Sequence, residues 1–225
     1  MILDFQNISK SFDNTLVLKD LKFGIFENSI LGLIGPNGSG KTTFLNIVAG
    51  LIKPDSGKIY KSKNSLQIGV NIGTKGFFSE FTVQHNLKIL SQIREGRSSC
   101  KSSVTILEKL GFTDFEKKYK NLSLGNKQKV SISSTFIGNP ALILLDEPYN
   151  ALEIEAIISL RELMISEKEK TSFILTSHNF DEIQRVADRI VIIKKGKIVS
   201  DNSTFNIIEE SGNLENYYKN LHENQ

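Results

Sequence analysis

The sequence predicts an α/β protein with a mostly parallel sheet, antiparallel strands at the N-terminus and an inserted block of helices. Three short apolar runs, SILGLIG, ALILLDEP and SFILTSH, have the length and composition of buried strands. Segments with apolar residues three or four apart lie between them, which is typical of helices. Buried strands that alternate with helices favour a parallel sheet covered on both faces. A long helical stretch interrupts this alternation.

The N-terminal region is predicted to contain strands around a tight turn. Residues 1–12 and 15–26 alternate apolar and polar side chains on either side of a turn-prone Asp-Asn pair, which predicts two strands near a sheet edge. Residues 42–51 predict an amphipathic helix that stops at Gly50, and residues 53–59 predict a turn that leads back into a strand.

The remainder is predicted to alternate between helices and strands. Helices are expected at 83–93, 102–112, 127–137, 153–170 and 179–189, the last capped by Asn179 and Asp181. A hairpin turning at Gly196 and a helical tail from about residue 202 follow. We therefore expect a single domain over 1–225, with a core of 1–80 and 135–225 and a helical block of about 81–134.

Composition excludes several classes of protein. The 225 residues are 39% hydrophobic and 24% charged, which suits a globular protein with a sizeable core. A net charge of +3 is too small to indicate a nucleic-acid partner. The single cysteine excludes an internal disulfide and fits a reducing compartment. No secretory signal is visible, and no stretch approaches about 20 apolar residues, so we expect no direct insertion into a membrane.

A glycine-rich motif follows the first apolar run. Residues 35–42, GPNGSGKT, fit the pattern G-x-x-x-x-G-K-[ST], with a predicted strand before it and a predicted helix after it. Backbone N–H groups of such a loop and the start of the helix bind phosphate oxygens. Lys41 would reach the β- and γ-phosphates, and the Thr42 hydroxyl would bind Mg²⁺. The predicted nucleotide-binding residues are Gly35, Pro36, Asn37, Gly38, Ser39, Gly40, Lys41, Thr42 and Thr43.

Two further apolar runs end in residues suited to phosphate chemistry. Asp146 follows ALILL, at the strand end where ligands bind in open α/β sheets, and would position Mg²⁺. Glu147 beside it is the expected general base for an attacking water. His178 ends SFILTSH and would hydrogen-bond the γ-phosphate and orient that water. With Lys41, Glu147 and His178 form the expected catalytic set, and Thr42 and Asp146 the metal ligands.

Together these motifs resemble the ATP-binding subunits of ABC transporters, over nearly the whole chain. Residues 122–126, LSLGN, are similar to the LSGGQ signature of that family. The resemblance implies ATP and Mg²⁺ as cofactors and a head-to-tail dimer of two ATPase subunits, identical or different. In such a dimer the signature residues would contact the nucleotide bound by the other subunit. These residues are Ser123, Leu124, Gly125 and Asn126.

Other positions follow from the same resemblance. Phe12 matches the aromatic residue that stacks on adenine, although a core strand residue is an open alternative. Glu153 stands where the family usually has Asp. Gly73 aligns with a Gln that contacts Mg²⁺ and water, and Asn71 would take that role if the alignment is shifted by two residues. The departures at Gly73 and Glu153 predict slow or absent turnover in the alternative interpretation below, and Glu153 is also expected to alter communication across the dimer.

The resemblance implies an ATP-hydrolysing subunit that powers a membrane transporter by ATP-driven dimerisation, docked on a permease at the cytoplasmic face of the membrane. The signature variant is similar to the branch that exports antibiotics and peptides. The helical block and the 68–78 loop are the expected docking surface. One alternative is an ATP-dependent binding switch, or a degenerate partner in a heterodimer with little turnover. Another is a soluble ABC ATPase of translation or repair, which usually carries two cassettes or a long coiled coil.

Overall fold

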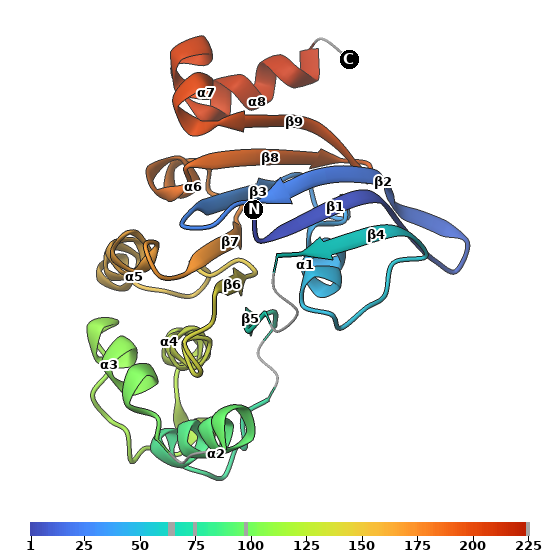
Figure 1. Cartoon of the computed structure of the whole chain (residues 1–225). Coiled ribbons are helices and arrows are strands. Elements are labelled where there is room, and N and C mark those ends of the chain that lie inside the picture. Colours follow the sequence, from blue (N-terminus) through green and yellow to red (C-terminus); the bar gives the residue numbers. More distant parts are fainter. Residues whose placement is uncertain (63–65, 74–75, 97–98, 224–225) are drawn as a thin grey trace.

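The computed structural model describes residues 1–62, 66–73, 76–96 and 99–223. Over these ranges the main sheet has the strand order β5-β6-β7-β3-β8-β9 (Figure 1). Its strands are β3 (Ile30–Ile34), β5 (Ile68–Asn71), β6 (Leu142–Leu145), β7 (Ser172–Thr176), β8 (Arg189–Lys194) and β9 (Lys197–Ser203). All neighbours from β5 to β8 pair in parallel, and β9 pairs antiparallel with β8. The predicted α/β class with a mostly parallel sheet is confirmed.

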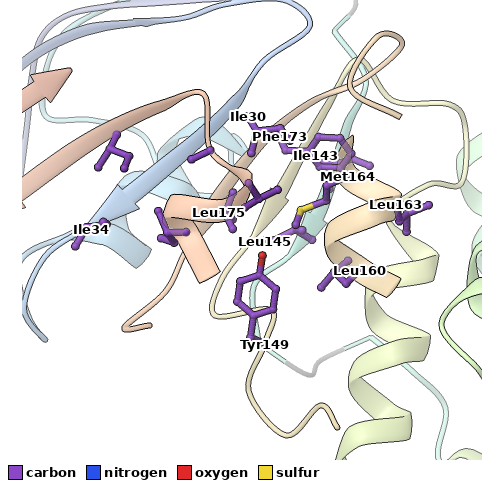
Figure 2. Packing of buried hydrophobic residues seen from close by; sticks show 14 of the residues in the cluster. Ile30, Ile34, Ile143, Leu145, Tyr149, Leu160, Leu163, Met164, Phe173 and Leu175 are labelled. Carbon is purple, nitrogen blue, oxygen red and sulfur yellow. The ribbon is translucent and has the colours of Figure 1, made fainter. Parts of the chain in front are cut away.

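Strands β3, β6 and β7 are buried along their whole length. They are the three apolar runs of the sequence, and a parallel strand packed on both faces requires this kind of composition. On one face lie α5 (Ile154–Glu167) and α6 (Phe180–Val186). Figure 2 shows side chains of this layer, including Phe173 and Leu175 of β7 with Leu160 and Met164 of α5.

The N-terminal strands form a second, antiparallel sheet. Its order is β2-β1-β4, with β1 (Leu3–Phe12), β2 (Thr15–Ile25) and β4 (Ser56–Lys61). Asp13 and Asn14 have φ values of 43° and 63°, as a two-residue hairpin turn of type I′ requires. The first two strands lie near a sheet edge as expected, because β2 is an edge strand and β1 lies between it and the other edge strand, β4.

The second face of the main sheet is covered by α1 (Lys41–Val48) and this small sheet, and not by helices alone. Phe44 of α1 lies with its ring centroid 5.0 Å from that of Phe5 and 4.9 Å from that of Phe23. These three buried rings join the small sheet to α1. The packing therefore holds the start of α1 at a set place beside the end of β3.

The helical block contains α2 (Val83–Glu95), α3 (Lys101–Lys109), η1 (Tyr119–Asn121) and α4 (Leu124–Ser134). Its helices share an apolar cluster of their own, built around Val83, Leu87, Leu107, Phe112 and Val130. This separate cluster supports the proposed division between core and helical block. Figure 1 shows α2 and α3 at the opposite end of the molecule from α7 (Thr204–Ser211) and α8 (Leu214–Glu223).

None of the helices in the described ranges is long and apolar enough to cross a bilayer.

The predicted loop at 68–78 is wrong in its first part, because residues 68–71 form β5, a parallel edge strand beside β6. Residues 74–75 of that loop lie outside the described residues. The strand has only four residues and includes Gly69, so its sequence lacks a clear strand pattern. A Cβ at Gly69 would lie 2.2 Å from the carbonyl oxygen of Thr135, just after α4. The glycine therefore allows the end of α4 to pack against the sheet.

We predict that Gly69→Ala destabilises the fold by about 1–3 kcal/mol, because the added methyl group forces backbone apart. Urea unfolding of the nucleotide-free protein measures the change. Gly96→Ala is the control, since none of the described residues lies within 4 Å of a Cβ at that position, where the unfavourable feature is a φ of 68°. A Gly69→Ala variant no less stable than the control would contradict the packing argument.

Candidate nucleotide-binding site

The glycine-rich loop joins β3 to α1 at the carboxyl end of the parallel sheet. Gly40 precedes α1 with φ 107°, and a Cβ there would lie 2.5 Å from the side chain of Leu18. No side chain caps α1, and its first turn contains no acidic residue. The first N–H groups of a helix have no partner within the helix and carry partial positive charge. This end of α1 is therefore suited to bind an anion such as phosphate.

Lys41 is buried beneath this loop. Its Nζ donates hydrogen bonds to the carbonyl oxygens of Gly35 and Pro36, at 2.7 and 3.2 Å. Burial lowers the pKa of Lys41, while the nearby carboxylates of Glu147 and Asp146 act in the opposite direction. The ammonium group is thus held at the loop by two neutral carbonyl oxygens.

Thr42 and Asp146 meet although they lie far apart in the sequence. The Thr42 Oγ1 donates to Asp146 Oδ2 at 3.0 Å. A hydroxyl and one carboxylate are the oxygen donors that Mg²⁺ prefers, with phosphates and water completing its shell. Among the described residues no group of three or more His, Cys, Asp or Glu side chains could hold a metal alone. The donor set therefore fits Mg²⁺ brought with a nucleotide.

Glu147 and His178 form the second pair at the site. Glu147 Oε1 lies 2.9 Å from His178 Nε2, and the backbone N–H of His178 donates to Glu147 Oε2 at 3.3 Å. Burial raises the pKa of Glu147, against the effects of His178 and Lys41. A carboxylate with a raised pKa accepts a proton more readily, which is the property a general base needs.

A cavity of about 420 Å³ brings most of the predicted residues together. It is lined by Asn37, Gly38, Gly40, Lys41, Thr42, Thr43, Asp146, Glu147 and His178, and also by Val17. Val17 was missed because β2 passes beside the loop only in the folded chain, where a Cβ at Gly40 would lie 3.1 Å from the Val17 carbonyl oxygen. Gly35, Pro36 and Ser39 belong to the loop but do not line this cavity in the part of the chain described.

Phe12 ends β1 at the hairpin, outside the lining of this cavity among the described residues. Its side chain is 43% exposed, so the alternative of a core residue is wrong. The Lys10 ammonium lies 5.4 Å from its ring centroid. An exposed ring remains available for stacking, and its role with adenine stays a prediction.

The signature residues lie at the start of α4. Ser123 caps the helix, its Oγ accepting from the Asn126 N–H at 3.3 Å. Packing within the chain explains the glycine at position 125, because a Cβ there would lie 2.5 Å from the carbonyl oxygen of Ala151. Leu124 is 71% exposed. These four residues lie outside the 420 Å³ cavity of their own chain, and their contact with a second subunit stays a prediction.

Gly73 lines a second cavity, of about 680 Å³, which also contains Thr42 and Asp146 on its wall. Among the described residues nothing lies within 4 Å of a Cβ at Gly73, so the position that the alignment gives to the family's Gln is open. Asn71 is buried and is absent from the lining, while its neighbours Val70 and Ile72 line the cavity. Asn71 instead accepts the Asp146 N–H on its backbone oxygen. The role of its side chain in place of the Gln stays a prediction.

Glu153 precedes α5 and makes no side-chain hydrogen bond to that helix end. An Asp at this position is a favoured N-cap residue, whereas the longer Glu side chain is not. The departure from the family pattern thus leaves the helix without this cap, with Glu153 exposed to solvent.

A phosphate-binding loop at a helix N-terminus, with a hydroxyl and two carboxylates beside it at strand ends, defines a P-loop protein that binds nucleoside triphosphates. Residues 18–150 match the profile of the ABC transporter family. The chain belongs to this family as an ATP-binding ATPase subunit of a transporter.

The chain is similar to curated relatives of differing transport direction. It is 35% identical to an uncharacterised ABC transporter ATP-binding protein of Methanocaldococcus jannaschii, covering 86% of this chain and 74% of the relative. It is 31% identical to SrtF, a lantibiotic transport ATP-binding protein of Streptococcus pyogenes, covering 97% and 96%. It is 32% identical to PotA, a spermidine/putrescine import protein of Mesoplasma florum, covering 95% of this chain and 65% of the relative.

Solved structures share the fold. An ATP-binding subunit of an ABC transporter superposes with a TM-score of 0.86 at 25% identity, covering 99% of this chain and all of the other. An ATP-binding cassette in a dimeric post-hydrolysis state, bound to ADP and Pi, superposes with a TM-score of 0.77 at 23% identity over 90% of this chain and 99% of the other.

We predict that Glu147→Gln raises the melting temperature of the nucleotide-free protein at neutral pH. Because the pKa of Glu147 is raised on folding, ionising this carboxyl costs folding free energy at pH values above its folded pKa. The cost disappears as pH falls below the unfolded value of about 4.3, so the difference between variant and wild type should shrink toward that pH. Thermal melts between about pH 5 and 8 measure the difference.

The control is Glu153→Gln, which removes the same charge at an exposed position. A gain for Glu147→Gln that stays constant with pH, or grows as pH is lowered, would show that ionisation of Glu147 is not the cause.

Proposed function

We propose that this chain hydrolyses ATP to drive a membrane exporter through ATP-dependent dimerisation. The observation that carries the proposal is the meeting of Lys41, Thr42, Asp146, Glu147 and His178 on one cavity. These residues come from the start of a helix and from two strand ends, and together they supply phosphate binding, metal ligands and a general base. The assignment of each residue below is part of the proposal.

The reaction needs little covalent chemistry from the protein, since phosphoryl transfer depends on positioning and charge neutralisation. The N–H groups before α1 and the Lys41 ammonium bind the β- and γ-phosphates. Thr42 and Asp146 hold Mg²⁺, which when bound neutralises phosphate charge. Glu147 takes a proton from the attacking water. His178, held 2.9 Å from Glu147, orients that carboxylate at the γ-phosphate.

The signature residues act on the nucleotide of the second subunit. Ser123 and the start of α4 are exposed at the surface, where a hydroxyl and a helix N-terminus can meet the γ-phosphate. ATP then joins two subunits, and its hydrolysis releases them. A cassette of the same fold forms a dimer in its post-hydrolysis state, which supports this arrangement.

The transport direction is proposed to be export. The similarity to the lantibiotic transport protein SrtF extends over 97% of this chain and 96% of that protein, which supports this direction. ABC ATP-binding subunits work with membrane permeases, so we place this chain at the cytoplasmic face on such a partner.

The 680 Å³ cavity is the proposed docking place for the permease. Apolar side chains of Val70, Ile72, Phe77 and Leu90 line it, together with Arg94. The Arg94 guanidinium donates to the Ser134 carbonyl at 2.9 Å, and no carboxylate among the described residues forms an ion pair with it. Charge complementarity therefore favours a docking segment with apolar side chains and one acidic residue.

We predict that Arg94→Glu lowers by about tenfold the fraction of this protein that sediments with membrane vesicles of its source cells, because reversing the charge repels an acidic segment. Lys88→Glu, on the exposed face of the same helix, is the control. Equal sedimentation of both variants would contradict the role of Arg94. Sedimentation with protein-free lipid vesicles would show lipid binding instead.

The central experiment measures Mg²⁺-dependent ATP hydrolysis against protein concentration. We predict a rate that rises faster than linearly, since two chains form each working site. Glu147→Gln should keep ATP binding, lose about 100-fold or more of the turnover and accumulate as an ATP-bound dimer in size-exclusion chromatography.

Lys41→Ala is the companion variant, which should lose ATP binding because the P-loop lysine pairs with phosphate charge. Normal turnover by Glu147→Gln would refute the general base. ATP binding without hydrolysis at any concentration would favour a switch or a heterodimer partner, as the open space at Gly73 allows.

A further inference from the structure

Thr176, the last residue of β7, contacts both acidic residues of the site through a single hydroxyl. Its side chain is fully buried. Its Oγ1 donates to Asp146 Oδ1 at 2.7 Å and accepts the backbone N–H of Glu147 at 2.9 Å. A hydroxyl has one proton and free lone pairs, so both hydrogen bonds form at the same time.

The first hydrogen bond sets the orientation of the Asp146 carboxylate. Oδ1 is taken by Thr176, which leaves Oδ2 facing Thr42 at 3.0 Å. Without this bond the carboxylate could rotate, and the oxygen offered to a metal beside Thr42 would no longer be set. Partners that orient a ligand in this way commonly decide metal affinity.

The second hydrogen bond, from the Glu147 N–H to Thr176 Oγ1, holds the backbone of Glu147 in an unfavourable conformation. Glu147 has φ 49°, in the left-handed region that few residues with a side chain adopt. Such a conformation persists where its surroundings fix it. The Thr176 hydroxyl binds the N–H of this residue, and two positions further on His178 contacts its carboxylate. The end of β7 thus fixes Glu147 at both its backbone and its side chain.

We propose that Thr176 is a positioning residue for ATP hydrolysis, because one hydroxyl sets both the metal-facing oxygen of Asp146 and the backbone that carries Glu147. The proposal rests on the roles of Asp146 and Glu147 in the proposed function. It assigns Thr176 no contact with nucleotide, water or metal.

A second buried threonine near the same strand can test whether the Thr176 hydroxyl has only a structural role. Thr171, just before β7, is also buried and donates its hydroxyl to the Pro140 carbonyl, far from both carboxylates. Losing either hydroxyl leaves a buried polar group without its partner, so stability alone cannot separate the two sites. Thr171→Val is therefore the matched control for Thr176→Val.

The experiment compares Thr176→Val, Thr176→Ser, Thr171→Val and wild type in two assays. Steady-state kinetics gives kcat and KM for ATP. Thermal shifts with ATP in EDTA, and with ATP at increasing Mg²⁺, report binding without turnover. We expect Thr176→Val to keep the shift caused by ATP alone, to need about tenfold more Mg²⁺ for the additional shift, and to lose about 10- to 100-fold in kcat. Its KM should change by less than about threefold. Thr176→Ser should stay near wild type.

Two results would overturn the proposal. One is wild-type kcat and Mg²⁺ dependence in Thr176→Val. The other is an equal loss in Thr171→Val or in Thr176→Ser, because a general effect of packing would then explain the result. If Thr176→Val does not fold, Thr176→Ala takes its place under the same criteria. The two proposals can fail separately. If the wild type hydrolyses ATP, Glu147→Gln does not, and Thr176→Val behaves like the wild type, then the role of Thr176 is rejected and the proposed function stands.

Discussion

The Asp146 carboxylate is the contact on which the rest of the site depends. One carboxylate oxygen accepts a hydrogen bond from Thr42 at the start of α1, and the other accepts one from Thr176 at the end of β7. The backbone N–H of Asp146 donates to the carbonyl oxygen of Asn71 at the end of β5. The residue follows β6, a strand without exposed side chains. The carboxylate thus joins α1 to β7, and the backbone of the same residue adds β5, where the parallel strands end.

This arrangement places polar groups at the edge of an apolar core. The strands that carry Asp146 and Thr176 are buried on both faces, so their register is strongly specified by packing. That rigidity allows Glu147 to keep a left-handed backbone and a carboxyl whose pKa burial raises. Both features cost stability in the absence of substrate, which is common where a site is organised for chemistry.

The sequence predicted the parts of the site that depend on local pattern. The loop around Lys41 has its chemistry within eight residues, and Asp146 follows an apolar run that marks a buried strand. Thr176 and Val17 escaped prediction because a threonine or a valine in a strand has no distinctive pattern, and only strand order brings either to the site. Strand β5 was missed for a related reason, since its Gly69 is explained by contact with Thr135 and not by its neighbours in sequence.

Helix α4 runs from the signature residues at its N-terminus to the contacts with α2 and α3 at its C-terminus. Ser123 begins it, and at its other end the carbonyl oxygens of Ser133 and Ser134 accept hydrogen bonds from Ser103 of α3 and Arg94 of α2. Its 11 residues span about 16 Å at 1.5 Å per residue. A tilt of about 10° at the end held by Arg94 would therefore displace Ser123 by about 3 Å, roughly the length of a hydrogen bond. In the proposed dimer, a small movement of the docking segment at Arg94 would then be enough to make or break the contact between Ser123 and a phosphate.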